Sequence, residues 1–187
     1  MKIWKLDAVG EKYDYLTPAN GYDIEEIYTY DGRSHKDEWN GRKVIPNIVR
    51  KKPNLGDYTK CLGIITFSQN AIEKLYDLIK DDVEFLPLDC DEGDFSMINV
   101  TTVLDAIDYE KSDYIMFDDG KRIMRFKKYV FHADVVKGHN IFKIVDENLN
   151  PVFVSDDFVK VVRKNRLKGF RFAFRWDSEA PLEDNDK

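Results

Sequence analysis

An ordered series of short strand signals between residues 94 and 176 constrains the fold more than any other feature of the chain. Each run is rich in β-branched or aromatic side chains and is bounded by turn residues, a pattern typical of strands. The predicted strands in this region are residues 95–100, 114–117, 123–126, 129–133, 141–145, 152–154 and 170–175. Consecutive short strands of this kind predict a mostly antiparallel sheet.

The connections between these strands carry further signals. Asp118, Asp119 and Gly120 separate residues 114–117 from residues 123–126, which predicts a hairpin with an Asp-Gly turn. Residues 101–105 are expected to form one helical turn. Phe170, Phe172 and Phe174 alternate with arginine and alanine, which indicates a half-buried last strand.

The N-terminal part is less regular. Residues 3–30 alternate weakly and contain several aromatic side chains, so they are predicted to form short strands with a turn at residues 18–21. Residues 31–53 are polar and predict a long exposed excursion with a short strand at residues 44–45. Residues 62–67 have the length and composition of a buried strand, and Pro87 predicts that residues 83–88 form an edge strand.

Two main helices are predicted, at about residues 68–80 and 156–167. Ser68 is placed to cap the first, whose apolar stripe consists of Ile72, Leu75, Tyr76 and Ile79. Ser155 is placed to cap the second, and the two following aspartates favour its N-terminal end through the helix dipole. Gly169 is the expected C′ residue of that helix.

The predicted fold class is therefore α+β, with a mostly antiparallel sheet and two main helices. A chain of 187 residues with 43% hydrophobic content can bury one substantial core. We expect a single domain over residues 1–176. Residues 177–187 are acidic and are expected to form a disordered tail.

Composition also limits the location of the protein. The first residues contain no apolar run typical of a signal peptide, and no later stretch approaches the roughly 18 apolar residues of a membrane helix. Cys61 and Cys90 do not have the spacing of a metal motif or of a disulfide framework. These features predict a soluble cytoplasmic protein.

Charge is divided unevenly along the chain. Residues 81–119 contain thirteen acids and one base, whereas residues 120–175 contain fourteen bases and five acids. One interpretation is that neighbouring strands neutralise each other when they pair. The other is an acidic face that attracts a basic partner.

Residue patterns for common chemistry are missing from the sequence. The three histidines lack partners at metal-ligand or catalytic spacing, and residues 89–94 have glycine at the wrong position for a calcium loop. Phosphate-binding glycine loops and nucleophile motifs are absent too. We therefore predict no catalytic residue, metal or cofactor, although carboxylate pairs are common enough to leave an unrecognised carboxylate site open.

Nucleic-acid binding has one possible basis, the arginines that alternate with phenylalanines near the C-terminal end. Such a strand can stack bases. The phenylalanines fit a core face better, and the net charge of −6 disfavours a phosphate backbone. We therefore expect no nucleic-acid partner.

Three sequence segments between residues 94 and 176 appear in a characteristic order. They are residues 95–108, residues 140–144, and residues 151–158 leading to 167–172. The most specific is the first, with Asn99, Val100, Leu104, Asp105 and Asp108. This ordered set resembles the C-terminal half of a family of bacterial polymorphic-toxin immunity proteins. That family is the eleventh of the numbered immunity families, with a myxobacterial prototype, and was formerly a domain of unknown function.

The resemblance implies a non-enzymatic immunity protein that binds and neutralises a cognate toxin domain, encoded by the neighbouring gene. A negative face would suit a basic toxin, and exposed aromatic residues would supply apolar contacts. The expected toxin-binding residues are Asp89, Asp91, Glu92, Asp94, Asp118, Asp119, Tyr28, Tyr30 and Trp39. A generic protein-binding adaptor, or less readily an enzyme with an unrecognised carboxylate site, is the alternative.

Overall fold

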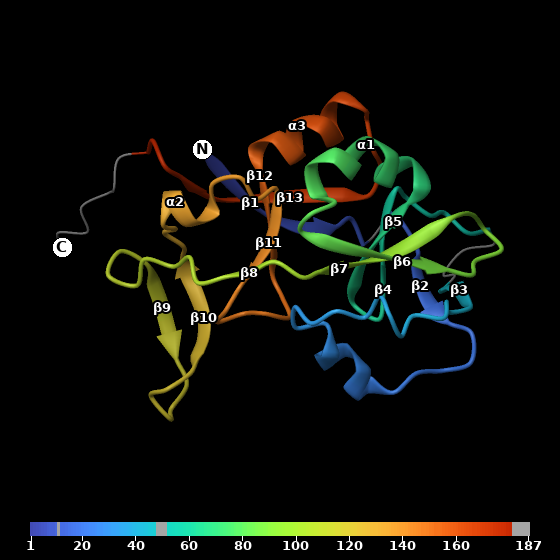
Figure 1. Ribbon diagram of the computed structural model, residues 1–187, viewed down its shortest axis with the longest axis horizontal. Coiled ribbons are helices and arrows are strands. Elements are labelled where there is room, and N and C mark those ends of the chain that lie inside the picture. Colours follow the sequence, from blue (N-terminus) through green and yellow to red (C-terminus); the bar gives the residue numbers. More distant parts are fainter. Residues whose placement is uncertain (11, 48–51, 181–187) are drawn as a thin grey trace.

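The computed structural model describes residues 1–10, 12–47 and 52–180 (Figure 1). The strands are β1 (Lys2–Ala8), β2 (Tyr15–Pro18), β3 (Val44–Asn47), β4 (Tyr58–Cys61), β5 (Ile64–Ser68), β6 (Val83–Leu88), β7 (Phe95–Val100), β8 (Val103–Leu104), β9 (Asp113–Met116), β10 (Ile123–Lys128), β11 (Ile141–Ile144), β12 (Val152–Ser155) and β13 (Phe170–Asp177). The helices are the 3-10 helix η1 (Ile24–Thr29) and the α-helices α1 (Gln69–Ile79), α2 (Ala133–Val136) and α3 (Asp156–Lys164).

The strands form two open sheets and a hairpin. One sheet has the order β3-β2-β4-β5-β7-β6, the other has the order β13-β1-β12-β11-β8, and β9 pairs with β10. Among the strands that the structure describes, each sheet contains one parallel pair, β2 with β4 and β8 with β11. The mixture of helices and sheets agrees with the prediction, but the sheets are mixed and the expected antiparallel character holds only in part.

The two edge strands of the six-stranded sheet meet at one end. The Val44 amide donates to the Asp89 carbonyl at 2.8 Å, and the Asp89 amide donates to the Arg42 carbonyl at 2.8 Å. These bonds connect the start of β3 to the residue that follows β6. Segments at opposite edges of the sheet are therefore neighbours on the surface.

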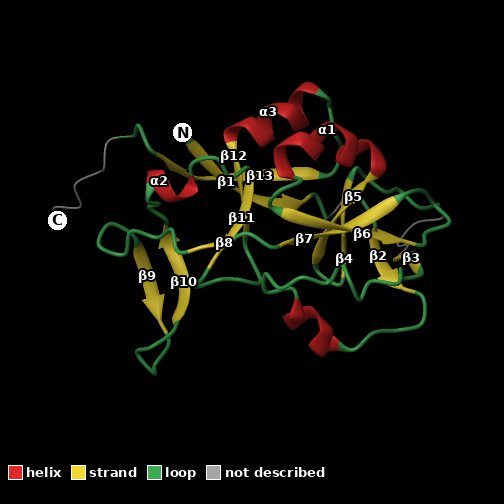
Figure 2. Cartoon of the chain, viewed as in Figure 1, coloured by secondary structure: helices red, strands yellow, loops and turns green. Residues whose placement is uncertain are grey.

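The largest core lies where both sheets meet α1 and α3, which run side by side on one side of the molecule (Figure 2). Each helix buries its apolar stripe, including Leu75 and Ile79 from α1 and Phe158 from α3. Ser68 and Ser155 cap the helices as predicted, accepting hydrogen bonds from the amides of residues 71 and 158. Burial of these stripes, rather than intrinsic propensity, stabilises such short helices.

Two further cores flank the sheets. An aromatic cluster containing Phe131, Phe142 and Phe153 packs between the five-stranded sheet and the β9–β10 hairpin. The third core contains Leu16, Tyr30 and Met97 and lies between the six-stranded sheet and the segment around η1. In Figure 2, η1 lies on the side of the molecule opposite α1 and α3.

Two predicted elements in the C-terminal half are wrong. Residues 101–105 do not form a helical turn, because Val103 and Leu104 pair in parallel with β11 as strand β8. Residues 129–133 do not form a strand: Phe131 makes a single bridge to Ile107, and α2 begins at residue 133. Both differences arise from pairing between segments distant in sequence, which local pattern does not encode.

The end of α3 also differs from the prediction. The helix ends at Lys164, and Arg166 takes the left-handed conformation with φ 55° while the Leu167 amide donates to the Val162 carbonyl at 3.1 Å. This is the Schellman arrangement, with arginine where glycine is usual. Gly169 is therefore not the C′ residue.

At the chain ends, the strand predicted at residues 170–175 continues to Asp177, and residues 178–180 form a turn. The remainder of the predicted tail, residues 181–187, lies outside the described residues. In the N-terminal part, η1 replaces an expected strand and is capped by Asp23, which accepts from the Glu25 amide at 2.9 Å. None of the helices described here has the length and apolar character needed to cross a membrane.

Candidate protein-binding surface

The acidic loop, residues 89–94, connects β6 to β7. Its carboxylate residues Asp89, Asp91, Glu92 and Asp94 are all exposed. Lys43 Nζ lies 4.0 Å from Asp91 Oδ2, and exposed ion pairs of this kind contribute little stability. The loop therefore presents concentrated negative charge to solvent.

The tip of the β9–β10 hairpin carries the second predicted acidic group. Asp118 and Asp119 are exposed, and Asp119 accepts hydrogen bonds from the Lys121 amide and the Arg122 Nε, each at 2.9 Å. The Lys121 amide is the main reason that the pKa of Asp119 is lowered. Figure 1 shows this tip and the acidic loop toward opposite ends of the long axis, so the fold separates the two groups.

The three predicted aromatic residues have different environments. Tyr28 is exposed, whereas Tyr30 is 1% exposed and belongs to the third core. Burial raises the pKa of Tyr30 to about 12. Trp39 is partly buried, and its Nε1 donates to the Pro87 carbonyl at 2.8 Å. The expected exposure therefore holds for Tyr28, is wrong for Tyr30, and holds only in part for Trp39.

Residues 30–35 are held against the body of the protein by buried polar groups. Lys143 on β11 donates to the Tyr30 carbonyl at 2.5 Å, and burial lowers the pKa of this lysine to about 8. Glu84 on β6 accepts from the His35 amide at 2.8 Å and from Asn99 Nδ2 at 2.9 Å. Partial burial alone would raise the pKa of Glu84, but these hydrogen bonds outweigh it and the pKa is lowered.

Sequence patterns gave no reason to select Lys143, Glu84 or Asn99 as supports for this surface. Asn99 was noted only as part of the family-like segment at residues 95–108. It is fully buried, and its amide also donates to the Arg33 carbonyl at 2.8 Å. The predicted exposed excursion is thus attached to β6, β7 and β11, so the surface that it carries is preorganised.

Asp89, at the start of the acidic loop, is connected to η1 through residues 42–44. These residues bond to Asp89 on one side, while the Lys43 carbonyl accepts from the Ala19 amide at 3.0 Å on the other. Arg42 also forms an ion pair with Glu26 of η1. The structure therefore links the start of the acidic loop to η1, whereas Glu92 lines a pocket with Asn70 and Lys168.

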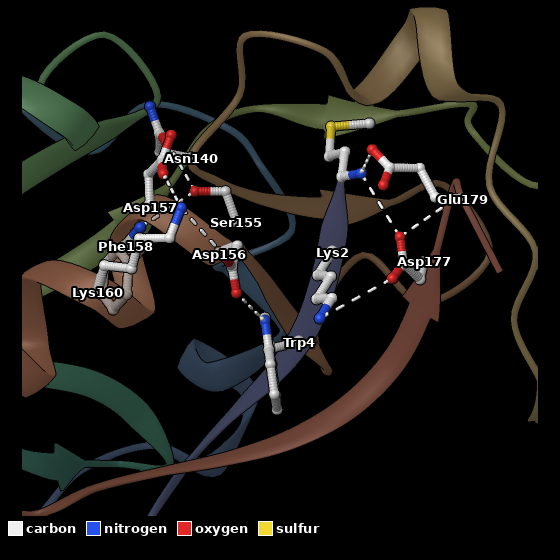
Figure 3. A network of polar contacts seen from close by, with 11 residues as sticks. Lys2, Trp4, Asn140, Ser155, Asp156, Asp157, Phe158, Lys160, Asp177 and Glu179 are labelled. Atoms are coloured by element: carbon white, nitrogen blue, oxygen red, sulfur yellow. Dashed lines mark hydrogen bonds and ion pairs between the residues drawn. The ribbon is translucent and has the colours of Figure 1, made fainter.

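A separate polar pocket of about 500 Å³ is the natural place to test for a carboxylate active site (Figure 3). It is lined by Met1, Lys2, Gly138, His139, Asn140, Ser155, Asp156, Asp157, Lys160, Asp177 and Glu179. Its carboxylates come from α3 and from the end of β13. They are thus brought together from parts of the chain about 20 residues apart in sequence.

The charged groups of this pocket are paired with one another. Lys160 Nζ lies 3.2 Å from Asp156 and 2.9 Å from Asp157, while the Met1 amino group lies 3.5 Å from Asp177. The Glu179 amide is the main cause of the lowered pKa of Asp177. A general acid needs a raised pKa, so this shift runs opposite to one that would keep a carboxyl group protonated at neutral pH.

Ser155 in the same pocket is engaged in structural bonds. Its Oγ accepts from the Phe158 amide at 3.2 Å and donates to Asn140 Oδ1 at 2.7 Å (Figure 3). His139 Nδ1 lies 2.7 Å from Oδ1 of the buried Asp82, which also accepts from Thr102 Oγ1. These bonds join the start of α3 and the residues before β6, β8 and β11.

Metal-ligating side chains do not gather anywhere in the described parts of the chain: no group of three or more His, Cys, Asp or Glu residues has a suitable arrangement. Cys61 and Cys90 are both free thiols. Burial raises the pKa of Cys61 to about 11, which disfavours the reactive thiolate.

The model of the family described as "Immunity protein family (Imm11)" matches residues 44–174, well over half of the chain. The chain belongs to this immunity family. The match begins at β3, about fifty residues before the segments on which the resemblance is based. It includes the acidic loop and both main helices. No curated protein matches the chain. An immunity family implies a toxin partner, and the surface described above is where we look for its contact.

Proposed function

We propose that this member of the immunity family acts in the cytoplasm of the producing bacterium, where it binds and neutralises a cognate toxin domain. The neighbouring gene encodes the toxin, and neutralisation needs no catalysis. The observation that carries the proposal is the family match together with an exposed acidic loop inside the matched region. The paired charges of the polar pocket favour this reading over an unrecognised carboxylate enzyme.

The acidic loop supplies a physical route to rapid neutralisation. An immunity protein must bind its toxin before damage accumulates, so a high association rate is valuable. Complementary charge raises association rates well above the neutral value and has less effect on dissociation. Asp89, Asp91, Glu92 and Asp94 would attract a basic toxin surface, and their exposed side chains keep this field in solvent.

The test is co-purification with the toxin domain encoded by the neighbouring gene, followed by a binding titration at about 50 and 300 mM salt. We expect a tight complex whose association slows as salt rises, because screening shortens the range of exposed charges. Tight binding that is indifferent to salt would retain the immunity role and discard the acidic loop as its guide. Absence of a complex at micromolar concentration would replace this proposal with the adaptor function.

A further inference from the structure

Exposed large apolar residues on η1, just before it, and on the β2–β3 pair are called the apolar patch. Its members are Tyr15, Tyr22, Ile24, Tyr28 and Ile45. Each has a side chain between 40% and 65% exposed. Two of them, Tyr15 and Tyr22, line one groove, and large apolar side chains at one place on a surface mark interaction sites more often than scattered ones do.

A groove of about 400 Å³ opens within this patch. Its apolar lining consists of Tyr15, Leu16, Tyr22, Ile27 of η1 and Leu62, and Thr17, Asn47, Lys60 and Gly63 complete it. Its dimensions suit one large apolar side chain from a partner. Residues that fill such pockets dominate the binding energy of protein interfaces.

The charge beside the groove indicates the kind of partner. Residues 20–31 contain four acids and no base. Asp23 and Glu25 have exposed side chains at the start of η1, next to Ile24. Asp89, the first residue of the acidic loop, is linked to η1 through residues 42–44. Lys60 in the groove lining is itself paired with Asp7 at 3.1 Å. A partner that fills the groove therefore meets the acids at the start of η1, which favours lysine and arginine beside its apolar contact.

The patch is held in place before any partner binds. Thr29 Oγ1 donates to the Glu26 carbonyl at 2.7 Å within η1, and His35 Nε2 lies 2.9 Å from the Thr29 carbonyl. Lys143 fixes the next residue, Tyr30, from β11. Such preorganisation reduces the conformational entropy lost on binding and so raises affinity.

We propose that the toxin domain docks on this apolar patch by inserting an apolar side chain, flanked by basic residues, into the groove. The inference rests on the proposed immunity function and assigns its main contact surface. The acidic loop then accelerates encounter, while Tyr22, Tyr28 and the groove slow dissociation. The divided roles follow from the general separation of charge effects on association and packing effects on dissociation.

The experiment measures association and dissociation rates of the purified toxin domain with Tyr22→Ala and Tyr28→Ala, singly and combined. Tyr76→Ala is the matched control, because Tyr76 is 48% exposed against 52% for Tyr22 but lies on α1. We expect the combined variant to weaken binding by about 30-fold or more, mainly through faster dissociation, and the control to change it less than about twofold. Thermal unfolding of each variant verifies that it is folded.

Two results would overturn the inference and are distinguishable. If wild-type protein binds tightly and the combined variant binds equally well, the patch is not the contact surface and the immunity function stands. If wild-type protein forms no complex, the immunity function fails and the assigned surface fails with it. As a second variant, Asp23→Asn with Glu25→Gln should slow association at low salt, and an unchanged rate would remove the basic flank from the proposal.

Discussion

At the residue scale, Lys143 places a buried ammonium group against the backbone just after η1. The lysine is 3% exposed and donates to the Tyr30 carbonyl. Burial lowers its pKa to about 8, because the charged form loses hydration that one carbonyl replaces only in part. The residue therefore holds the segment after η1 in place and lowers the stability of the folded protein at neutral pH.

This cost predicts a pH dependence. In the unfolded chain Lys143 keeps its proton to about pH 10.4, whereas in the folded protein it releases the proton near pH 8. Between these values the unfolded state binds more protons, so stability rises with pH. Relative to Lys143→Met, the wild-type free energy of unfolding should increase by on the order of 2 kcal/mol between pH 7 and pH 10.

The measurement is urea unfolding of both proteins across that pH range. The methionine variant cannot titrate at this site, so other ionisations cancel in the difference. A difference that stays flat from pH 7 to pH 10 would contradict the assignment.

Tyr28 and Tyr30 show how far the exposure of a single side chain can be predicted from the sequence. Both were expected to be exposed, and only Tyr28 is. Their environments diverge because the Tyr30 side chain packs with Val44, Leu86 and other residues of the third core. Those contacts connect positions far apart in the chain, so no local pattern distinguishes the two tyrosines.

At the scale of elements, Gly169 lets the start of β13 pass close to β4. Its φ is +91°, and a Cβ built there would lie 2.3 Å from the Tyr58 carbonyl oxygen. The Tyr58 amide donates to the Lys168 carbonyl at 3.0 Å, which fixes the crossing. Only glycine satisfies both the backbone conformation and the contact.

We predict that Gly169→Ala destabilises the protein by about 3 kcal/mol, the sum of backbone strain and overpacking. Gly138→Ala is the matched control, because Gly138 has φ +95° but open space where its Cβ would lie. The control should cost only about 1 kcal/mol. Chemical unfolding measures both, and equal costs would show that the close approach to Tyr58 is unimportant.

Element prediction succeeded where local chemistry is strong. The serine caps of α1 and α3 and the Asp-Gly hairpin are confirmed, and so is Pro87 in an edge strand. It failed for β8, whose two residues form a strand only because β11 lies beside them. The position of Gly169 was recognised but its role was not, because Arg166 ends the helix instead.

At the scale of the whole molecule, the two acidic groups lie toward opposite ends of the long axis (Figure 1). Charges separated by more than about 10 Å are largely screened at ordinary salt. If the toxin domain docks near η1 as proposed, we expect it to respond mainly to the acidic loop. The aspartates at the hairpin tip are expected to affect toxin association less, because they lie toward the end of the long axis opposite the acidic loop, whose first residue is linked to η1.

This separation gives a matched pair of variants. Asp91→Lys with Glu92→Lys, and Asp118→Lys with Asp119→Lys, each change the net charge from −6 to −2. We expect the loop variant to slow toxin association by about tenfold at low salt, and the hairpin variant by less than about twofold. Stopped-flow binding measures both rates. Equal slowing would mean that only net charge matters, and a larger effect at the hairpin would move the interface there.

The sequence by itself determined the class of fold, the two capped helices, most of the strands and the family resemblance. These follow from short-range rules of side-chain periodicity, capping and turn chemistry, which act over a few residues. It also identified the acidic loop, because loops between strands reach the surface wherever the strands lie. The division into two mixed sheets did not follow from those rules.

Only the tertiary structure decided which surfaces stand together. Residues 42–44 join the acidic loop to η1 through bonds between the two edges of one sheet, and Glu84, Asn99 and Lys143 hold the intervening segment. The same packing buries Tyr30, leaves Tyr28 exposed and carries the hairpin acids to the far end. The physical reason is that long-range pairing and burial depend on the whole chain, whereas sequence patterns report only on neighbours.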